Sequence, residues 1–570
     1  MARWLRRSSD PLAVAALASD LRLPVLVARL LVQRGVSNPE DARRFLAPAL
    51  ADLHDPYRML GMRAAVDRLR RACAASENIL IYGDYDVDGT TSVVLLRKAI
   101  ELAGGRAEFH IPHRLKDGYG MREEVIERAG RDGVRLIVSV DTGTRAAPVV
   151  ERAAGIGIDC IITDHHLPDE ALPPALSFLN PNQPGCSYPE KNLCGVGVAF
   201  KLAQALLGSL EWPRERLEKV LLSMLRMVAI GTVADVVPLL GENRIIVKFG
   251  LEGLCRPVNV GLKALLASAG FAEGRRPTAG EVAFRVAPRL NAAGRMATAA
   301  DVIELFSVTD AGRAAELAAR LSGLNSDRQL TEAAILENAL GALPEALPAE
   351  QTSLVAAGEG WHRGVIGIVA SRLVERFHRP TLVVSIDPEE GVARGSGRSI
   401  RGFHLLGALE SMKDLFHRHG GHRQAAGFEL PAARVDELRA RFEQYARTRL
   451  TPEDLIPELS IDADLAFADI NDQNMAALER LEPYGMGNPE PVFASAGVKI
   501  SSEPRIVKEK HLKLVLRQDG RTMSAMGWNM AGRAGTLSAG AALDAAFTVE
   551  PDDYWGVGWR LVLKDFLTGH

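Results

Sequence analysis

The spacing of hydrophobic and polar residues changes along the chain, and each change predicts a different kind of structure. Residues 1–75 carry apolar residues at helical spacing, most clearly in RLPVLVARLLVQRG, and predict a helical region that ends before the next pattern begins. From residue 76, short apolar runs alternate with amphipathic stretches. The runs Ile79–Tyr82, Leu136–Val140 and Cys160–Thr163 are typical of buried parallel strands, and 91–103, 121–130 and 145–154 of crossing helices. This alternation predicts an α/β domain with a parallel sheet.

The rest of the chain repeats this pattern once and then changes to short strands. After helices at 195–208, 214–231 and 241–254 comes an Ala- and Leu-rich stretch that predicts a helical connector. A second α/β pattern starts near residue 350, with strands at SLVAAG and TLVVSI and a helix at 365–377 between them. Strand-like runs such as HLKLVLRQ and WRLVLKDF then predict a C-terminal β-barrel of the OB-fold type. The predicted domains are 1–75, 76–255, 256–345, 346–452 and 453–570.

Composition narrows the function classes. The 570 residues include 68 basic and 71 acidic residues, so the net charge of −3 excludes a wholly basic nucleic-acid coat but allows a local basic groove. The five cysteines form no CxxC pair, which favours buried thiols over a zinc site or disulfides. No apolar run approaches the ~20 residues of a membrane helix. Arg3, Arg6 and Arg7 before Leu12–Leu17 imitate a signal peptide, but Asp10-Pro11 begins a helix there. A cytoplasmic protein without membrane contact is expected.

Acidic and histidine residues follow three of the predicted strands. Asp84, Asp86 and Asp88 come directly after the first strand, Asp141 follows the second, and Asp164-His165-His166 follows the third. Because the carboxyl ends of parallel strands meet at one sheet edge, these side chains are expected to lie together. A solvated acidic loop and structural histidines are the alternatives. Oxygen and imidazole ligands without thiolate favour Mn²⁺ or Mg²⁺. Two such cations, roughly 3.5–4 Å apart, would suit hydrolysis at phosphorus.

A further carboxylate interrupts an apolar run. Asp235 stands inside VAIGTVADVVPLL, where a buried unpaired charge would be expensive. The residue is therefore expected to have a cationic partner, although this pattern alone does not decide between a structural ion pair and a metal ligand.

Four segments together resemble a known family. GDYDVDG, SVDTG, TDHH and TVADVVPL are similar, in order and spacing, to the motifs of the DHH phosphoesterases. RGSGRS and GGHRQAAGF resemble the DHH-associated domain, and LEPYGMGNPEPVF resembles the start of the oligonucleotide-binding barrel found in the exonucleases of this family. The resemblance covers nearly the whole chain, and it is to single-strand-specific 5′→3′ DNA exonucleases.

The resemblance implies roles for the matching residues. Asp86 and Asp88 would each hold a different metal, Asp141 would bridge the two, and His165 and Asp235 would complete one of the shells. His166 would lie close behind, against the scissile phosphate or orienting the ligands. Asp84 would be either a ligand or a neighbour of the ligands. Related phosphatases have a histidine where this chain has Tyr82, which predicts a weaker or more solvated metal at that position.

Glycine-rich segments in the second half carry the predicted substrate contacts. Glycine allows a phosphate to approach the backbone, and arginine can bind it through two hydrogen bonds. Tight turns with incidental surface arginines are the alternative. The candidates in these segments are Arg394, Ser396, Arg398, Gly421, His422 and Arg423. Ser396, Arg398 and Arg114 are predicted to hold the 5′-terminal phosphate. Arg289, Asn291 and Arg295 are predicted to form a phosphate-contacting elbow, with a structural ion-pair role nearly as well supported.

The predicted barrel combines basic and aromatic residues, which suits single-stranded nucleic acid. The basic set is Arg505, Lys508, Lys510, Lys513 and Arg517. The aromatic set is Phe493, Trp528, Tyr554 and Trp555, which are individually better explained as core.

These observations predict a two-metal, single-stranded-DNA-specific 5′→3′ exonuclease that releases 5′-mononucleotides. The alternatives are another DHH phosphodiesterase, such as an oligoribonuclease or cyclic-dinucleotide hydrolase, and a catalytically silent replication scaffold. The resemblance further implies a role in DNA recombination and repair, and partnership with a helicase and a single-strand-binding protein. A monomer is expected.

Overall fold

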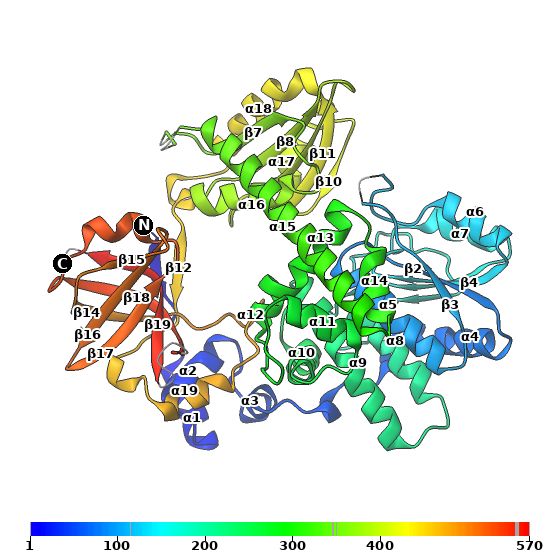
Figure 1. Ribbon diagram of the computed structural model, residues 1–570, viewed down its shortest axis with the longest axis horizontal. Helices are drawn as coiled ribbons and strands as arrows, with labels where there is room; N and C mark the ends of the chain where they lie inside the picture. The colour runs from blue at the N-terminus through cyan, green and yellow to red at the C-terminus, as the bar shows by residue number, and fades with distance from the viewer. Residues whose placement is uncertain (1, 115, 345–346, 349, 553–557, 569–570) are drawn as a thin grey trace. The chain divides into compact units, whose positions relative to one another are not determined.

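The computed structural model describes residues 2–114, 116–344, 347–348, 350–552 and 558–568. The chain forms two compact units. One combines Met1–Ala49 with Ile456–His570, and the other spans Leu50–Leu455. Within the described residues, no helix is both long and apolar enough to cross a membrane. Figure 1 labels the helices and strands of both units.

The N-terminal lobe of Leu50–Leu455 is built on a parallel sheet with the strand order β3-β2-β4-β5-β6. Its strands are β2 (Asn78–Tyr82), β3 (Ala107–His110), β4 (Val134–Val140), β5 (Asp159–Thr163) and β6 (Ser177–Leu179). The three predicted strands are confirmed. The sequence pattern did not reveal β3 and β6, because β3 is only partly buried and β6 has three residues.

Helices cover both faces of this sheet, as expected for buried parallel strands. They are α4 (Met62–Ala74), α5 (Val87–Leu102), α6 (Glu123–Arg131), α7 (Ala147–Gly155) and α8 (Gly195–Gly208). Alternate residues of one strand enter different cores: Ile81 packs with α4, α5 and α8, whereas Leu80 packs with α6 and α7. Because the strands are all parallel, their carboxyl ends lie together at one edge of the sheet.

A helical region follows the sheet. It consists of α9 (Arg214–Ala234), α10 (Gly241–Leu254), α11 (Val260–Ser268), α12 (Ala279–Glu281), a π-helical turn (Val282–Val286), α13 (Ala287–Met296), α14 (Ala300–Ser307) and α15 (Ala311–Gly341). The expected elbow at 287–296 is wrong as local structure, because this segment is the regular helix α13. Leu290 and Ala293 are buried on its inner side, while Asn291 and Arg295 stay partly exposed.

The C-terminal lobe of the same unit contains a mixed sheet with the order β10-β11-β9-β8-β7. Its strands are β7 (Leu354–Glu359), β8 (Thr381–Asp387), β9 (Val392–Arg398), β10 (Arg418–Gly421) and β11 (Ala425–Pro431). The helices are α16 (Ile366–Phe377), α17 (Leu405–Glu410) and α18 (Val435–Arg447). On one face the sheet packs against α17 and α18, and on the other against α16 and the end of α15.

The unit formed by the two chain ends contains a closed barrel. The strands β14 (Phe493–Ile500), β18 (Ala542–Pro551), β19 (Trp559–Thr568), β17 (Arg521–Gly527) and β16 (His511–Gln518) pair in this order, and β14–β16 pairing closes the ring. The remaining elements are β1 (Arg3–Arg6), β12 (Glu458–Ile461), β13 (Ala463–Asp464), β15 (Arg505–Val507), α1 (Pro11–Leu21), α2 (Val25–Gln33), α3 (Pro39–Leu46) and α19 (Asp472–Glu479). The fold class expected from the sequence is confirmed.

Strand β1 differs from the all-helical N-terminus that the sequence predicts. It pairs in parallel with β12, and the indole Nε1 of Trp4 donates a hydrogen bond of 2.9 Å to Asp565 in β19. The partners lie more than four hundred residues away in sequence, so no local pattern could reveal them.

Candidate metal centre

The acidic loop after β2 is fixed by two helix N-termini. Asp86 is the N-cap of α5, and its Oδ1 accepts a hydrogen bond of 3.1 Å from the backbone N–H of Gly89. Asp88 is fully buried and accepts hydrogen bonds from the first backbone N–H groups of α8, at 2.6 Å from Gly195 and 2.7 Å from Val196. The positive end of the α8 dipole thus stabilises a carboxylate that is otherwise removed from water.

His165 stands at the middle of three carboxylates. Its Nε2 lies 3.2 Å from Oδ1 of Asp141, 3.7 Å from Oδ2 of Asp235 and 3.9 Å from Oδ2 of Asp88. Asp141 has a left-handed backbone with a φ of 58°, a conformation that Asp tolerates better than most residues. This backbone angle turns the carboxylate at the end of β4 toward the histidine.

The same carboxylate also belongs to a second group. Candidate ligand atoms of Asp84, Asp86 and Asp141 lie within 4.8 Å of one another, as do those of Asp88, His165 and Asp235. Among the described residues, Asp84 Oδ1, Asp141 Oδ1 and Asp235 Oδ2 are buried without a hydrogen-bond partner. Buried polar atoms are normally satisfied, so these oxygens are free to bind cations. A donor set of oxygen and imidazole nitrogen fits Mn²⁺ or Mg²⁺.

The ionisation of these groups is strongly perturbed. Burial, with the charges of neighbouring carboxylates, raises the pKa of Asp88 to about 7 and that of Asp235 to about 9. The same causes raise the pKa of Asp84 and Asp141 well above the ordinary range. Burial and the charge of His166 lower the pKa of His165 to about 4, which keeps its imidazole neutral and able to bind a metal. Positive charge at this position would relieve the repulsion among the carboxylates.

Asp164 serves the loop rather than the cluster. Its Oδ1 accepts hydrogen bonds from the backbone N–H of His165 at 2.8 Å, and lies 2.7 Å from Nδ1 of His166, while Oδ2 accepts from Thr144 N–H at 2.9 Å. Burial opposes ionisation of Asp164, but these bonds outweigh it and lower its pKa to about 2. The carboxylate also raises the pKa of His166 against the effect of burial. The contact between Asp164 Oδ1 and Nδ1 holds the imidazole ring of His166 in place.

Several residues around the centre could not be found from the sequence, since their role depends on contacts between distant elements. The Tyr119 hydroxyl donates to the backbone oxygen of Asp141 and lies 3.2 Å from Nδ1 of His166. Asn180 and Asn182 donate to the backbone oxygens of His166 and His165, at 2.8 and 3.1 Å. The polar segment NPNQPG, which contains both asparagines, follows β6, a strand that the sequence pattern did not reveal. Tyr82, which stands where related phosphatases have a histidine, donates a hydrogen bond to the backbone oxygen of Gly120.

Arginines gather beside the acidic centre. Burial and the charges of Arg114, Arg398 and Arg328 lower the pKa of Arg295 to about 10, and the Asp86 carboxylate partly offsets them. Arg114 lies over the Tyr85 ring at 4.8 Å. Arg398 donates to Ser396 Oγ at 3.2 Å and to its neighbour's backbone oxygen. Like charges drawn together in this way attract an anion.

A pocket of about 450 Å³ opens at this position. It is lined from one side by the loop after β3 and from the other by β9, β10 and β11. Arg114, Arg394 and Ser396, which are predicted substrate residues, line it. Its further basic residues, which no sequence pattern indicated, are Lys116, Arg122, Arg363 and Arg418.

Several predicted substrate residues are held by other groups of the protein, including Arg394 in the lining of this pocket. Arg394 forms ion pairs with Glu429 at 2.8 Å and Glu390 at 2.7 Å. Arg289 donates to the backbone oxygen of Arg285 and to Ser322 Oγ at 3.2 Å. Gly421 has a φ of 143° in the β10–β11 turn, where a Cβ atom would meet the backbone of Ala425. His422 and Arg423 are exposed in the same turn.

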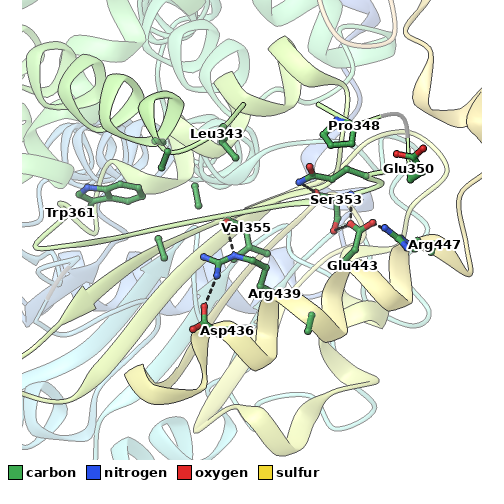
Figure 2. Close-up of a pocket in the computed structure, with 16 residues that line it drawn as sticks. Leu343, Pro348, Glu350, Ser353, Val355, Trp361, Asp436, Arg439, Glu443 and Arg447 are labelled. Carbon is green, nitrogen blue, oxygen red and sulfur yellow. Dashed lines mark hydrogen bonds and ion pairs between the residues drawn. The ribbon is translucent and has the colours of Figure 1, made fainter. Parts of the chain in front are cut away.

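A second pocket, of about 600 Å³, lies between the end of α15, β7 and α18 (Figure 2). Its main charged groups are satisfied within the pocket. Glu443 accepts hydrogen bonds from Thr352, Ser353 and Arg447, and Arg439 pairs with Asp436. Trp361 and Leu343 supply apolar surface (Figure 2). The paired charges make this pocket a poorer candidate for chemistry than the metal centre.

In the barrel unit, the basic residues lie on the strand pair β15–β16 and the loop between them. Lys513 is opposite Arg505, and Arg517 is exposed on the same strand as Lys513. Trp528 is exposed and packs edge-on against His511, whereas Phe493 is buried in the core. The predicted stacking residues Tyr554 and Trp555 lie outside the described residues.

Comparison with known families agrees with this arrangement. Residues 78–232 match the DHH family, N-terminal domain, and residues 350–448 match the DHHA1 domain. A parallel sheet that ends in an Asp and His cluster, followed by this second lobe, defines a DHH-type protein. Residues 461–565 match the RecJ OB domain.

Full-length relatives define the family more narrowly. The chain is 39% identical to the single-stranded-DNA-specific exonuclease RecJ of Dickeya dadantii, over 87% of this chain and 88% of the relative. It is 41% identical to RecJ of Bacillus subtilis over 92% of this chain, although it spans only 66% of that protein's length. The crystal structure of RecJ with Mn²⁺ from Thermus thermophilus superposes with a TM-score of 0.84 at 31% identity, covering 100% of this chain and 80% of the other. The chain belongs to the RecJ family.

Proposed function

We propose that this protein is a single-stranded-DNA-specific exonuclease that hydrolyses phosphodiester bonds from the 5′ end and releases 5′-mononucleotides. The observation that carries the proposal is the set of buried carboxylate oxygens without hydrogen-bond partners, on Asp84, Asp141 and Asp235, directly beside the arginines around Arg295. An anion-binding group next to a cation-binding group is what phosphate hydrolysis needs. The names of the RecJ relatives support DNA as the polymer.

The proposed cofactors are two divalent cations, Mn²⁺ or Mg²⁺, both of which are named in solved Thermus thermophilus RecJ structures. Asp88, His165 and Asp235 would hold one cation, Asp86 with Asp84 would hold the other, and Asp141 would serve both. The grouping of Asp84 and Asp86 with Asp141, and of Asp88 and Asp235 with His165, supports this assignment, as does the 3.2 Å between Asp141 Oδ1 and His165 Nε2. Bound cations supply Lewis acidity, which lowers the pKa of water and stabilises charge on the phosphate oxygens.

The protein's own residues would orient the reacting groups. Asp164 and Tyr119 hold the His166 ring through Nδ1, so Nε2 is the nitrogen that can face a phosphate. The Asp164 carboxylate raises the pKa of His166 against the effect of burial, which favours the charged form of a ring that would face an anionic phosphate. Arg295, whose Nη1 donates to the backbone oxygen of Gly364 at 2.9 Å, fixes the approach of the second lobe.

We assign the 5′-terminal phosphate to Ser396, Arg398 and Arg114. The first turn of α16 closes this pocket, because a Cβ atom on Gly367 would stand 2.9 Å from Ser396 Oγ. A helix N-terminus also carries the positive end of the helix dipole, which favours an anion. A terminal phosphate monoester carries more charge than an internal diester, so these donors would select the chain end.

We further propose that the segments 76–255, 346–452 and 453–570 act as catalytic, substrate-binding and nucleic-acid-binding domains, joined by the connector 256–345. The segment 1–75, which begins with strand β1, precedes them. A cytoplasmic monomer that works with a helicase and a single-strand-binding protein in recombination and repair is the matching cellular role. Sedimentation of the purified chain tests whether it is a monomer. Affinity capture, with a point variant of Arg398 as control, tests whether it binds a helicase and a single-strand-binding protein.

The test of the main proposal is incubation with single-stranded DNA labelled at either end, with and without Mn²⁺. Stepwise release of 5′-mononucleotides from the 5′ end is expected, and only with metal. Matched duplex DNA should resist. Degradation from the 3′ end, or equal activity in chelator, would contradict the proposal.

A further inference from the structure

Phe284 is the most exposed large hydrophobic side chain among the residues that the structure describes, at 84%. It lies in the π-helical turn Val282–Val286. Val282 and Val286 are both fully buried in the helical core and anchor the turn on either side of it. The phenyl ring therefore projects outward from a rigid base. Single exposed apolar residues are common, so its position decides whether it matters.

The turn continues directly into α13, which runs toward the metal centre. Seven residues after Phe284, Oδ1 of Asn291 accepts a hydrogen bond of 3.3 Å from the backbone N–H of Val87, next to Asp86. Arg295 follows one turn later, among the arginines near Arg398. At 1.5 Å per residue, Phe284 lies about 10 Å from Asn291 along the helix and about 16 Å from Arg295. Phe284, the contact of Asn291 with Val87 beside Asp86, and Arg295 thus follow one another along this helical segment.

The surroundings of the turn are positively charged. Arg285 pairs with Glu281 at 2.9 Å and packs on the Phe271 ring at 4.1 Å, and Arg275 shares the same glutamate. Arg289 makes its hydrogen bonds to backbone and hydroxyl oxygens, at 3.4 Å to Ser268 and 3.2 Å to Ser322. Arg275 and Arg285 thus share one glutamate near an exposed ring, and neither of these hydrogen bonds of Arg289 reaches a carboxylate. This combination suits a strand of nucleic acid, with phosphates near the cations and a base on the ring.

We propose that Phe284 stacks on a base of the single-stranded substrate, on the 3′ side of the scissile bond. The inference rests on the proposed function. The 5′-phosphate residues lie at the Arg295 end of α13, so a strand that passes the metal centre continues toward Phe284. A separation of about 10 Å from Asn291 corresponds to roughly three nucleotides at stacked spacing, and fewer in an extended strand. The residue lies outside the segments that match family domains.

The test uses the full-length protein with Mn²⁺ and a series of 5′-phosphorylated oligonucleotides. In each, a single abasic site stands at a different distance from the 5′ end. The wild type should show a raised KM at one abasic position a few nucleotides from the end. Phe284→Ala should raise KM on intact DNA by about tenfold and should show no further effect at that position, because the ring that the base contacts is absent. The rate constant kcat for the first bond should stay within a factor of about two, since the ring lies away from the reacting atoms.

Two further variants separate stacking from general hydrophobic contact. Phe284→Tyr should keep the wild-type abasic profile, whereas Phe284→Leu should lose it. Val258→Ala is the control, because that side chain is 73% exposed on the loop between α10 and α11. Identical abasic profiles for the wild type and Phe284→Ala would overturn the proposal, as would a changed oligomeric state in place of a changed KM. Failure of the wild type to degrade DNA would instead overturn the proposed function.

Discussion

A Cβ atom on Gly195 would stand 2.6 Å from the Cβ atom of Asp141. The first residue of α8 therefore has to be glycine for its backbone N–H to reach Asp88 while the helix end lies against the carboxylate that two metal groups share. The positions of two predicted ligands, Asp88 after β2 and Asp141 after β4, therefore depend on this close approach.

Gly195→Ala should disturb the metal centre without touching a ligand. The added methyl group pushes the start of α8 away from both Asp88 and Asp141. We expect Mn²⁺ affinity to fall by about ten- to a hundredfold, as for other changes that displace metal ligands. Calorimetric titration with Mn²⁺ measures this directly.

The matched control is Gly323→Ala in the middle of α15, where no atom lies within 4 Å of the new methyl group. It should leave Mn²⁺ binding unchanged and stabilise the fold by about 0.4–1 kcal/mol. Equal Mn²⁺ affinity in both glycine variants would show that the approach of α8 does not matter.

Asp141→Asn should nearly abolish hydrolysis. The change keeps the shape of the side chain but removes the charge that both metal groups share, so we expect turnover to fall by about a hundredfold or more. Metal content and single-turnover rates should be measured on the same sample. Asp169→Asn, at an exposed carboxylate paired with Arg145, is the control. Near-normal turnover with two bound metals would remove Asp141 from the assignment.

The stability of the metal-free protein should fall as pH rises. Burial raises the folded-state pKa of Asp88 to about 7 and of Asp235 to about 9, above roughly 3.9 in the unfolded chain. In this range the folded chain keeps protons that the unfolded chain has released, so the stabilisation is complete below about pH 4 and is lost as pH rises through about 7 to 9. Melting temperatures in chelator should decrease over this window.

Because a cation replaces those protons, the gain in melting temperature on adding Mn²⁺ should grow over the same range of pH. Asp235→Asn should flatten both trends. A melting temperature in chelator that rises with pH, in the wild type but not in Asp235→Asn, would be inconsistent with the raised pKa values.

Arg398→Ala should reduce the preference for 5′-phosphorylated over 5′-hydroxyl DNA. Loss of a hydrogen bond to a charged group costs about 1.5–3 kcal/mol, which is roughly ten- to a hundredfold in the ratio of kcat/KM values. Arg394→Ala makes a useful comparison, because that guanidinium is already paired with Glu390 and Glu429 and should change the ratio less. An unchanged ratio in Arg398→Ala would move the end-recognition site elsewhere.

The fragment Leu50–Leu455 should cleave short oligonucleotides but bind long strands weakly. It keeps the metal centre and lacks the whole unit that contains the barrel. Removing only residues from about 455 onward would leave Met1–Ala49 without the partners of β1. Equal loss of activity on short and long DNA would argue against the barrel as an extended grip.

The sequence predicted the local and periodic parts of this molecule well. The buried strands around Ile79 and Leu136 were visible as apolar runs, and parallel strands bring their carboxyl ends together, so the cluster of Asp86, Asp141 and His165 was foreseeable as an arrangement. Their individual roles stay predictions. The sequence predicted an elbow in place of helix α13 because Asn291 and Arg295 make the segment polar. The burial of Ala293 on the other side of the helix results from tertiary packing, which the sequence pattern does not show.

Contacts between distant segments were beyond reach. The clearance at Gly195, the hydroxyl of Tyr119 behind His166 and the pairing of Arg394 each depend on elements that the chain brings together only on folding. The sequence alone does not show whether the charge of a basic residue in a glycine-rich segment is balanced by a nearby carboxylate.

The pairing of β1 with β12 has a consequence for synthesis. A chain made from its N-terminus exposes Arg3–Arg6 to the cell long before Glu458–Ile461 exists. The unit Leu50–Leu455 can complete its cores as it emerges, because all of its segments are then present. Strand β1 must wait, unpaired, until β12 has left the ribosome. The unit that contains both strands therefore matures after Leu50–Leu455, and termination before β12 would leave β1 without its partner.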